Sequence, residues 1–256
     1  MNLSIFQIIN YLLILVIFII LGRYVWSMIF DRNYLPIQWQ KAVKEMTVSL
    51  ELIRIEKSYP DKVRFFNWWF QVERLKKENV VGAFAELGVY KGESAKILCL
   101  MDPGRKMHLF DTFAGLPEKD LAVEHGEAAT YTPVNFADTS IEKVKKNLGD
   151  AADYEIHEGY FPETIKGLEN EIFALVNMDA DLYNPTIAGL EFFYPRLSPG
   201  GVMLVHDYNH KWEGVMKAVD EFARKIPESV ISLPDMDGTV MIIKNKTVNP
   251  HAGTRI

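Results

Sequence analysis

The sequence contains a single cysteine among its 256 residues, and it therefore has no CxxC spacing. One cysteine excludes an internal disulfide and fits a reducing compartment, and the missing CxxC spacing argues against a zinc site. Cys99 lies in the apolar run "AKILCLM", where a buried structural thiol is expected rather than a nucleophile. The chain length suits one catalytic-sized domain with a substantial core.

A concentrated basic face is also missing. The chain has 28 lysines and arginines against 34 acids, a formal net charge of −6. Its basic residues alternate with acids, as in "VERLKKENV" and "IEKVKKNL", which is typical of solvated helix faces. Because binding to nucleic-acid phosphates needs a clustered basic surface, no nucleic-acid partner is predicted.

Residues 3–22, "LSIFQIINYLLILVIFIILG", contain no charged residue. Twenty helical residues at roughly 1.5 Å each span about 30 Å, the thickness of the hydrocarbon core of a bilayer. Tyr24 and Trp26 follow as candidate interfacial anchors. We therefore predict a transmembrane anchor over residues 3–22.

A cleaved signal peptide is the alternative interpretation of this apolar stretch. Such a peptide has basic residues before its apolar core and small residues at its cleavage site, whereas this chain has "MNLS" before and the bulky "GRYVWSMIF" after. An uncleaved single-pass anchor is favoured. Positive charges follow the span and none precedes it, which places the main domain in the cytoplasm. These charges are on Arg23, Arg32, Lys41 and Lys44.

Residues 31–80 are predicted to form a helical N-terminal extension or a lid. The segments "QWQKAVKEMTVSLELIRIEKS" (38–58) and "DKVRFFNWWFQVERLKKEN" (61–79) carry apolar residues near helical spacing. The aromatic cluster within the second segment is expected to serve packing, with a lid over a neighbouring pocket as the other possibility.

After residue 80, short apolar runs alternate with amphipathic segments, a pattern that predicts a doubly wound, Rossmann-like α/β fold with a mostly parallel sheet. Only "PDMD" separates the last two predicted strands, so these should pair antiparallel. Residues 81–245 are the predicted catalytic domain, and the tail 246–256 is expected to be disordered. Seven strands are predicted, over 81–87, 106–111, 153–158, 172–179, 201–207, 228–233 and 238–244.

The first predicted strand ends in "FAELGVYKGES", which has the form E-x-G-x-x-x-G and not the G-x-G-x-x-G of a pyrophosphate site. A turn carrying Glu86 repels anions, while Gly88 and Gly92 allow close backbone approach to a ligand. Asp111 ends the second strand, where this fold class places an acid on a ribose diol, although it could instead cap the turn "DTFAGLP". Together these residues indicate a nucleoside ligand without phosphates, and S-adenosylmethionine fits that description.

Two further acids end the fourth and fifth predicted strands. If these strands are adjacent, Asp179 and Asp207 meet at the carboxyl edge of the sheet, where ligands bind in open α/β folds. Such carboxylates repel one another unless one is protonated or a cation neutralises them, and oxygen ligands suit Mg²⁺. His206 could join as a ligand or as a proton acceptor, or bond a neighbouring strand. Asp181 could belong to the same site or organise the turn "DLYNPT".

The blocks "FAELGVYKGES", "HLFDTFAGLPE", "FADTS", "HEGYFPETI" and "NMDADLYNPTIAGLEFFYPRLSPGGVMLVHDY" resemble the macrocin O-methyltransferase (TylF/MycF-like) family over roughly residues 60–245. Members of that family are class I enzymes that depend on S-adenosylmethionine and Mg²⁺ and methylate sugar hydroxyls. The resemblance implies that Glu86, Gly88 and Gly92 line the cofactor, with Asp111 near its ribose.

The same resemblance implies that Asp179 is a metal ligand and general base and that Asp207 is a second metal ligand. Where family members have two consecutive acids, this chain has His206-Asp207. An imidazole can replace one ligand, but the loss of a negative charge should weaken binding of Mg²⁺. His206 is thus predicted as a metal ligand or a catalytic proton acceptor.

The sequence therefore predicts a membrane-anchored O-methyltransferase that uses S-adenosylmethionine, with assistance from Mg²⁺. Its predicted acceptor is a hydroxyl of a sugar, in a small molecule or in a glycosylated or lipid-linked compound. Two alternatives are a non-catalytic, membrane-tethered binding module with the same fold, which only His206 supports, and a nicotinamide-dependent oxidoreductase. The missing G-x-G-x-x-G argues against the oxidoreductase.

Overall fold

The computed structural model describes residues 4–30, 35–149 and 153–246, so the predicted tail over 247–256 lies outside the described residues. The chain divides into two compact units, residues 1–47 and 48–256. The predicted extension over residues 31–80 is thus divided between them. Within the first unit, α1 (Ile5–Phe30) is followed by α2 (Ile37–Lys44).

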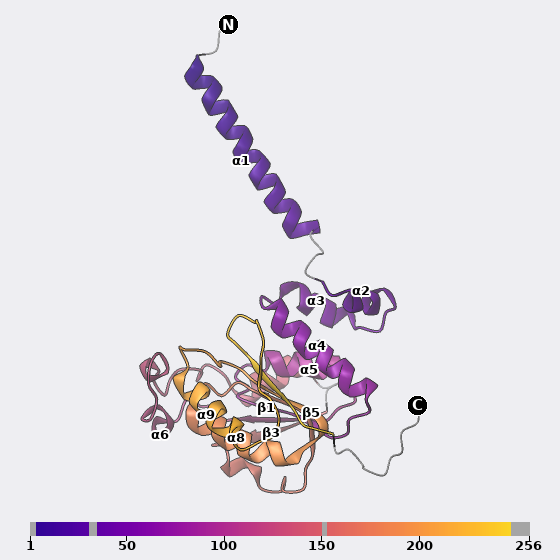
Figure 1. Ribbon diagram of the computed structural model, residues 1–256, viewed down its shortest axis with the longest axis vertical. Helices are drawn as coiled ribbons and strands as arrows, with labels where there is room; N and C mark the ends of the chain where they lie inside the picture. Colours follow the sequence, from indigo (N-terminus) through magenta and orange to yellow (C-terminus); the bar gives the residue numbers. More distant parts are fainter. Residues whose placement is uncertain (1–3, 31–34, 150–152, 247–256) are drawn as a thin grey trace. The chain divides into compact units, whose positions relative to one another are not determined.

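Helix α1 is apolar on every side, and it is drawn as the long indigo helix of Figure 1. Its segment Ile5–Met28 is long and apolar enough to cross a membrane, and none of that segment is buried within the protein. Length and composition alone fit both a membrane span and a signal sequence near the N-terminus.

The second unit begins with α3 (Leu50–Ser58) and α4 (Lys62–Lys77), each with a side-chain cap. The Ser49 hydroxyl accepts a hydrogen bond from the backbone N–H of Leu52, which starts α3 and interrupts the helical segment expected over residues 38–58. Asp61 caps α4 in the same way. Helix α4 buries the aromatic cluster, which includes Phe65, Phe66, Trp68 and Trp69.

A seven-stranded sheet forms the centre of this unit, in the order β3-β2-β1-β4-β5-β7-β6. The first five strands are parallel, and β7 pairs antiparallel with both β5 and β6. The predicted doubly wound sheet, its adjacent fourth and fifth strands and its antiparallel end are therefore confirmed. The strands are β1 (Ala83–Leu87), β2 (Met107–Asp111), β3 (Tyr154–Glu158), β4 (Phe173–Met178), β5 (Leu197–Val205), β6 (Ile231–Ser232) and β7 (Val240–Ile243).

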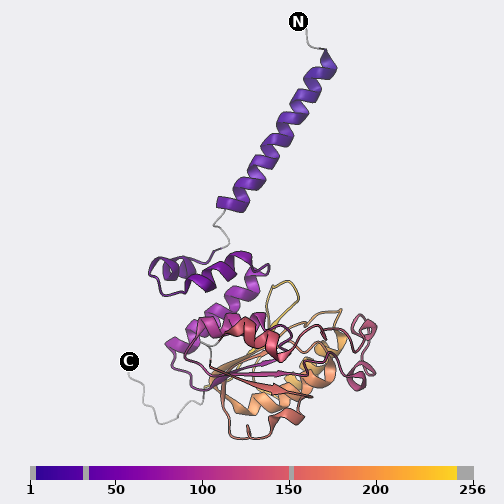
Figure 2. The same cartoon turned by 180° about the vertical axis from the view of Figure 1, so that it is seen from behind.

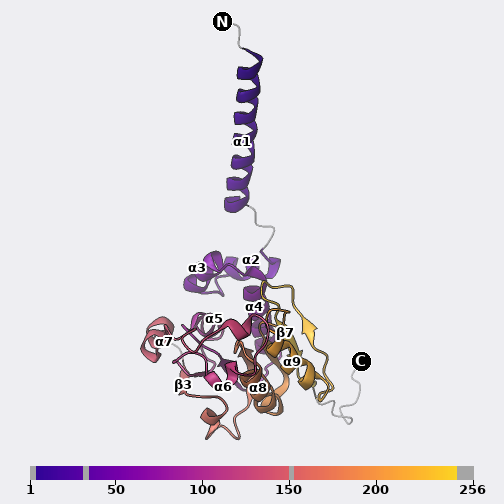
Figure 3. The ribbon, with the colours of Figure 1, turned by 90° about the vertical axis from the view of Figure 1, so that its left-hand side faces the viewer.

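Helices cover both faces of the sheet, as Figures 1 and 3 show. Helices α3, α4, α5 and α7 pack together on one face, with α5 and α7 side by side in Figure 2, while α8 and α9 pack against each other on the opposite face. The helices that connect the strands are α5 (Glu93–Met101), α6 (Glu118–Leu121), α7 (Ile141–Leu148), α8 (Tyr183–Arg196) and α9 (Glu213–Ala223).

Strands β1 and β4 are buried along their whole length, because helices cover both faces of the sheet there. Burial on both faces explains why these strands are nearly continuous apolar runs in the sequence. Two polar residues interrupt those runs, Glu86 and Asn177, and each is completely buried. They lie side by side in the sheet register, directly behind the carboxyl edge.

Candidate active site

A cavity of about 320 Å³ lies at the carboxyl edge of the sheet. That volume is in the range of small-molecule sites. The segments that follow β1, β2, β3 and β4 all contribute to its wall, and α4 adds two residues. The lining residues include Arg64, Trp68, Gly88, Asp111, Tyr160, Asp179 and Asp181.

The two glycines of the first turn are required by the packing of the chain itself. Gly88 has a φ of +85°, and a Cβ atom there would lie 1.9 Å from the backbone oxygen of Asp179. At Gly92 a Cβ would press on Leu148 and Val144 of α7. Of these two predicted cofactor residues, Gly88 lines the cavity, whereas Gly92 is absent from the described lining and begins α5. Gly92 thus lets α5 approach α7, and its predicted contact with the cofactor stays a prediction.

Asp111 holds the turns around the cavity. Its Oδ2 atom accepts hydrogen bonds from the backbone N–H groups of Val89 at 2.7 Å and Tyr90 at 2.8 Å. Its Oδ1 atom accepts one from Phe113 at 2.7 Å. Since each carboxylate oxygen offers two lone pairs, Oδ1 retains one free position. Asp111 therefore acts as the turn cap that the sequence allowed, with room for one ribose hydroxyl.

Glu86 lies behind the glycine turn and is outside the described cavity lining. Its Oε1 atom accepts a hydrogen bond of 2.8 Å from the side-chain amide of Asn177. Burial raises the pKa of Glu86 to about 8, against the lowering effect of hydrogen bonds from Ser94 and Asn177. The predicted direct contact of Glu86 with the cofactor stays a prediction. The observed hydrogen bonds of Glu86 are to neighbouring residues behind the glycine turn.

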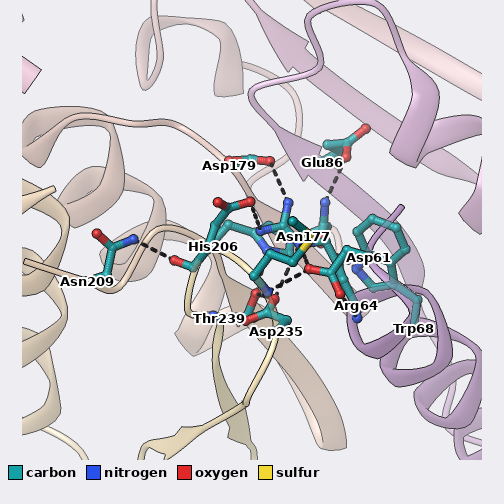
Figure 4. Close-up of polar contacts among 12 residues, drawn as sticks. Asp61, Arg64, Trp68, Glu86, Asn177, Asp179, His206, Asn209, Asp235 and Thr239 are labelled. Carbon is teal, nitrogen blue, oxygen red and sulfur yellow. Dashed lines mark hydrogen bonds and ion pairs between the residues drawn. The ribbon is translucent and has the colours of Figure 1, made fainter. Parts of the chain in front are cut away.

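Asn177 joins Glu86 to a buried polar network that extends to Trp68 of α4 and to Thr239, the residue before β7 (Figure 4). Its Oδ1 atom accepts a hydrogen bond of 3.0 Å from the indole N–H of Trp68. Because an indole can only donate, this contact fixes the orientation of the amide. The Nε2 atom of His206 lies 2.7 Å from the same oxygen, so Nε2 must carry a hydrogen. The other ring nitrogen, Nδ1, lies 2.7 Å from the hydroxyl of Thr239.

His206 therefore differs from its predicted role as a metal ligand and proton acceptor. Both ring nitrogens are engaged, by Asn177 and Thr239, and the side chain is completely buried. Burial lowers the pKa of His206 to about 4, so the ring is neutral at pH 7. The carboxylate group at the edge of the sheet does not include it. His206 serves as a strand-to-strand hydrogen-bonding residue, the alternative that the sequence had left open.

The three acids Asp179, Asp181 and Asp207 form this carboxylate group, with one oxygen of each within 4.8 Å of the others. Asp181 and Asp207 have φ angles of +59° and +62°, a strained conformation that turns both side chains toward Asp179. Burial, followed by repulsion from neighbouring acids, raises the pKa values of Asp181 and Asp207 well above the usual range. The expected meeting of Asp179 and Asp207 is observed, and Asp181 joins them.

Arg64 is a site residue that the sequence analysis missed. Its guanidinium Nη1 atom lies 3.9 Å from the Asp179 carboxylate, and its Nε atom lies 3.3 Å from Asp235. Nη2 contacts Asp237 at 3.2 Å. The Arg64 side chain is 11% exposed and that of Asp235 is 1% exposed, so this pair is largely desolvated, whereas Asp237 is 58% exposed. The only sequence signal was an arginine at the start of the aromatic run of α4.

The arrangement fits the two groups that the fold implies. Three oxygen donors and no imidazole make up this group among the described residues, which matches the preferences of Mg²⁺. Asp179, Asp181 and Asp207 would hold this ion. The cavity, with Asp111 at one end of the glycine turn and Asp179 at the other, suits an uncharged nucleoside joined to an amino acid better than a phosphate.

A sequence model of the macrocin-O-methyltransferase (TylF) family matches residues 54–241. A 4'-O-methyltransferase from Streptomyces olivaceus that acts on 8-demethyl-8-(2,3-dimethoxy-alpha-L-rhamnosyl)-tetracenomycin-C is 29% identical over 156 residues, which are 57% of this chain and 60% of that protein. Demethyldecarbamoylnovobiocin O-methyltransferase from Streptomyces niveus is 29% identical over 184 residues, 65% of this chain and 68% of its own length.

Among solved structures, the O-methyltransferase NovP is similar, with a TM-score of 0.61 and 27% sequence identity. The superposition covers 72% of this chain and 81% of NovP. The chain thus spans about 60% of the length of the tetracenomycin relative and most of the length of NovP.

Proposed function

Because this chain belongs to the macrocin O-methyltransferase (TylF) family, we propose that it transfers a methyl group from S-adenosylmethionine to a hydroxyl of a sugar. One observation carries the proposal. A single cavity brings together the glycine turn, a carboxylate with one free position at the end of β2, and Asp179 and Asp181, two of the three acids of the carboxylate group. The glycine turn and Asp111 would bind the cofactor at one end of the cavity, and Asp179 would act on the acceptor at the other end.

The cofactor would lie across the glycine turn. Asp111 would accept a hydrogen bond from one ribose hydroxyl through the free position of Oδ1, while its other positions keep the turns of Val89 and Phe113 in place. Gly88 keeps the chain close to Asp179, so the methyl group would be presented near the carboxylate group. Positioning of two reactants in this way supplies a large part of the rate enhancement.

At the reacting end, Asp179 would accept the proton of the sugar hydroxyl. The hydroxyl oxygen bonds the methyl carbon as the carbon–sulfur bond breaks, and S-adenosylhomocysteine is the second product. Bound Mg²⁺ would lower the pKa of the hydroxyl. Arg64, 3.9 Å from Asp179, provides a permanent positive charge beside this carboxylate.

The acceptor we propose is a sugar carried by a glycosylated or lipid-linked compound at a membrane. The similar protein from Streptomyces olivaceus methylates a rhamnosyl derivative of tetracenomycin, according to its name. Helix α1 supports the membrane part, because its 24-residue apolar segment is unburied. Arginines and lysines that follow the span support a catalytic domain on the cytoplasmic side.

Calorimetric titration of the full chain in detergent tests the cofactor directly. We expect S-adenosylmethionine and S-adenosylhomocysteine to bind with micromolar dissociation constants and NAD⁺ to show no binding. Titration with MgCl₂ should give a signal in the wild type that Asp207→Asn abolishes. Binding of NAD⁺ instead of S-adenosylhomocysteine would overturn the proposed function, whereas absence of a magnesium signal would remove only the metal from it.

A further inference from the structure

Two histidines on neighbouring strands lie against each other on one face of the sheet. The rings of His108 on β2 and His157 on β3 stack with their centroids 5.2 Å apart, and His108 Nδ1 lies 2.9 Å from His157 Nε2. Glu155 is the register partner of His108 and lies two residues before His157, so it is on the same face. None of these three residues is among the described residues that line the cavity.

Hydrogen bonds to neighbouring groups do not account for this pair. His108 is completely buried, but its described hydrogen-bond partner is the other histidine, and its Nε2 atom has no partner among the residues that the structure describes. In His206, by contrast, polar side chains engage both ring nitrogens. A neutral imidazole can carry its hydrogen on either nitrogen, so both facing nitrogens of the pair can present lone pairs to a cation.

Both rings are in the neutral form that binds metal ions. Burial lowers the pKa of His108 to about 4, and the positive charge of Lys106 adds to this effect. Burial also lowers the pKa of His157. The rings are held in place by aromatic neighbours, since His157 stacks on Phe110 with centroids 4.5 Å apart and His108 meets the ring of Phe173 at 5.8 Å.

Glu155 completes a set of three ligand atoms. Its Oε2 atom lies 4.0 Å from His108 Nδ1, and its Oε1 atom lies 4.0 Å from His157 Nε2. Two donor atoms on a tetrahedral zinc ion, each at about 2.0–2.1 Å, are about 3.3 Å apart. The observed separations of 2.9 and 4.0 Å lie on either side of that value, so small side-chain shifts would bring the three atoms onto one ion.

The cluster is open to solvent on the side of Glu155, whose side chain is 48% exposed. Lys106 Nζ lies 2.7 Å from Glu155 Oε2 and is the cation that now neutralises this carboxylate. Its side chain is 42% exposed, and an exposed ion pair of this kind is weak. A divalent ion that also gains two imidazole ligands can therefore displace the lysine.

We propose that His108 Nδ1, His157 Nε2 and the Glu155 carboxylate bind a divalent transition-metal ion such as Zn²⁺, which joins β2 to the edge strand β3. Two imidazoles and one carboxylate are a ligand set that zinc accepts, with water in the fourth position. The carboxylate group at the ends of β4 and β5 contains only oxygen donors and suits Mg²⁺ instead. The inference does not depend on the proposed methyl transfer. The sequence did not indicate this site, because the two histidines lie 49 residues apart.

The experiment is calorimetric titration of the untagged full-length protein in detergent with Zn²⁺ at neutral pH, with Mg²⁺ in excess. The wild type should bind one zinc ion with a micromolar or lower dissociation constant. His157→Asn should weaken binding by at least about 10²-fold, because it removes one of three protein ligands. Lys106→Gln should tighten binding by about threefold or more, because it removes the cation that competes for Glu155.

His210→Asn is the matched control, because it removes an exposed histidine outside the cluster, and it should leave the zinc affinity unchanged. Binding should also persist in Asp207→Asn, which separates this site from the carboxylate group. Absence of zinc binding by the wild type overturns the inference, as does loss of binding in Asp207→Asn or unchanged affinity in His157→Asn. If His157→Asn does not fold, Glu155→Gln and Lys106→Gln at exposed side chains still decide, and unchanged affinity in both overturns the inference.

Discussion

Gly88 is the residue at which the fold and the candidate site depend most directly on the absence of a side chain. Its φ of +85° is unfavourable for other residues, and an added Cβ would meet the backbone oxygen of Asp179 at 1.9 Å. We predict that Gly88→Ala lowers the free energy of unfolding by roughly 2–4 kcal/mol, from combined backbone strain and overpacking. Urea denaturation of the full chain measures this change.

Gly104→Ala is the control for that substitution, because no atom lies within 4 Å of the added Cβ there. It should change the free energy of unfolding by less than about 0.5 kcal/mol. Equal effects of the two substitutions would contradict the close approach of the glycine turn to β4.

Glu86 should make stability depend on pH. Burial raises its pKa from 4.5 to about 8, so the folded protein holds a proton that the unfolded chain releases. The stabilisation is complete below pH 4.5 and is lost as the pH rises toward 8, by about 1.4 kcal/mol per pH unit for one group. We predict that Glu86→Gln removes this slope. The free energy of unfolding of the variant, relative to that of the wild type, should therefore increase by roughly 2–4 kcal/mol between pH 5 and pH 8.

Urea denaturation of both proteins at the two pH values measures that difference, and the comparison cancels groups that titrate equally in each. Glutamine keeps an oxygen for the amide of Asn177, so the hydrogen bond itself is preserved. A difference between variant and wild type that is the same at pH 5 and pH 8 would mean that Glu86 is ionised in the folded protein.

At the scale of single residues, the sequence predicted where site residues lie in the fold better than it predicted their hydrogen-bond partners. Asp179 and Asp207 were expected together because parallel strands end at one edge of the sheet. His206 was expected beside Asp207, but consecutive residues at a strand end point in opposite directions, and His206 bonds Asn177 and Thr239 instead. Hydrogen bonds of that kind depend on three-dimensional neighbours that one sequence does not reveal.

At the scale of elements, α4 and the loop between β6 and β7 are held together by charges. Arg64 of α4 pairs with Asp235 and Asp237 of that loop, and Asp61 accepts a hydrogen bond from the backbone N–H of Met236 at 2.8 Å. Helix α4, which this loop contacts, lines the cavity through Arg64 and Trp68. Helix α4 therefore contributes to the wall of the site as well as to the packing of the second unit.

We predict that Arg64→Gln loosens the loop over residues 233–239 without unfolding the sheet. Amide hydrogen exchange of the loop should rise by about tenfold or more, because a largely buried arginine leaves three acids without their partner. Arg74→Gln, at the other end of α4, is the control, since Arg74 bonds Glu78 and the backbone oxygen of Gly200. Unchanged exchange in Arg64→Gln would show that the ion pairs do not hold the loop.

Most elements of the second unit were predictable because each strand is a short apolar run and each helix an amphipathic segment. The antiparallel end followed from the short connection before β7. The interruption between α2 and α3 was not predicted, because apolar spacing continues through it and only Ser49 indicates a new cap. Arg64 was missed because Asp179, Asp235 and Asp237, which it contacts, lie far away along the chain.

At the scale of the whole molecule, we predict a single-pass membrane protein whose second unit faces the cytoplasm. The full chain should remain in membranes after extraction with alkaline carbonate, because its apolar segment Ile5–Met28 is unburied. A C-terminal green fluorescent protein fusion should fluoresce in bacteria, and a C-terminal alkaline phosphatase fusion should be inactive. The opposite result of the two fusions would place the domain outside and require a different acceptor.

Transfer of labelled methyl groups tests the central claim most directly. The full chain would be incubated with methyl-labelled S-adenosylmethionine, Mg²⁺ and glycosides or membrane glycolipids of its own host, alongside Asp179→Ala. Glu191→Gln, an exposed acid of α8 paired with Lys225, is the control. We expect O-methylated sugar from wild type and Glu191→Gln, and a loss of about 10²-fold or more in Asp179→Ala. Full activity of Asp179→Ala would contradict the assigned site, and the absence of labelled sugar with the wild type would contradict the proposed function.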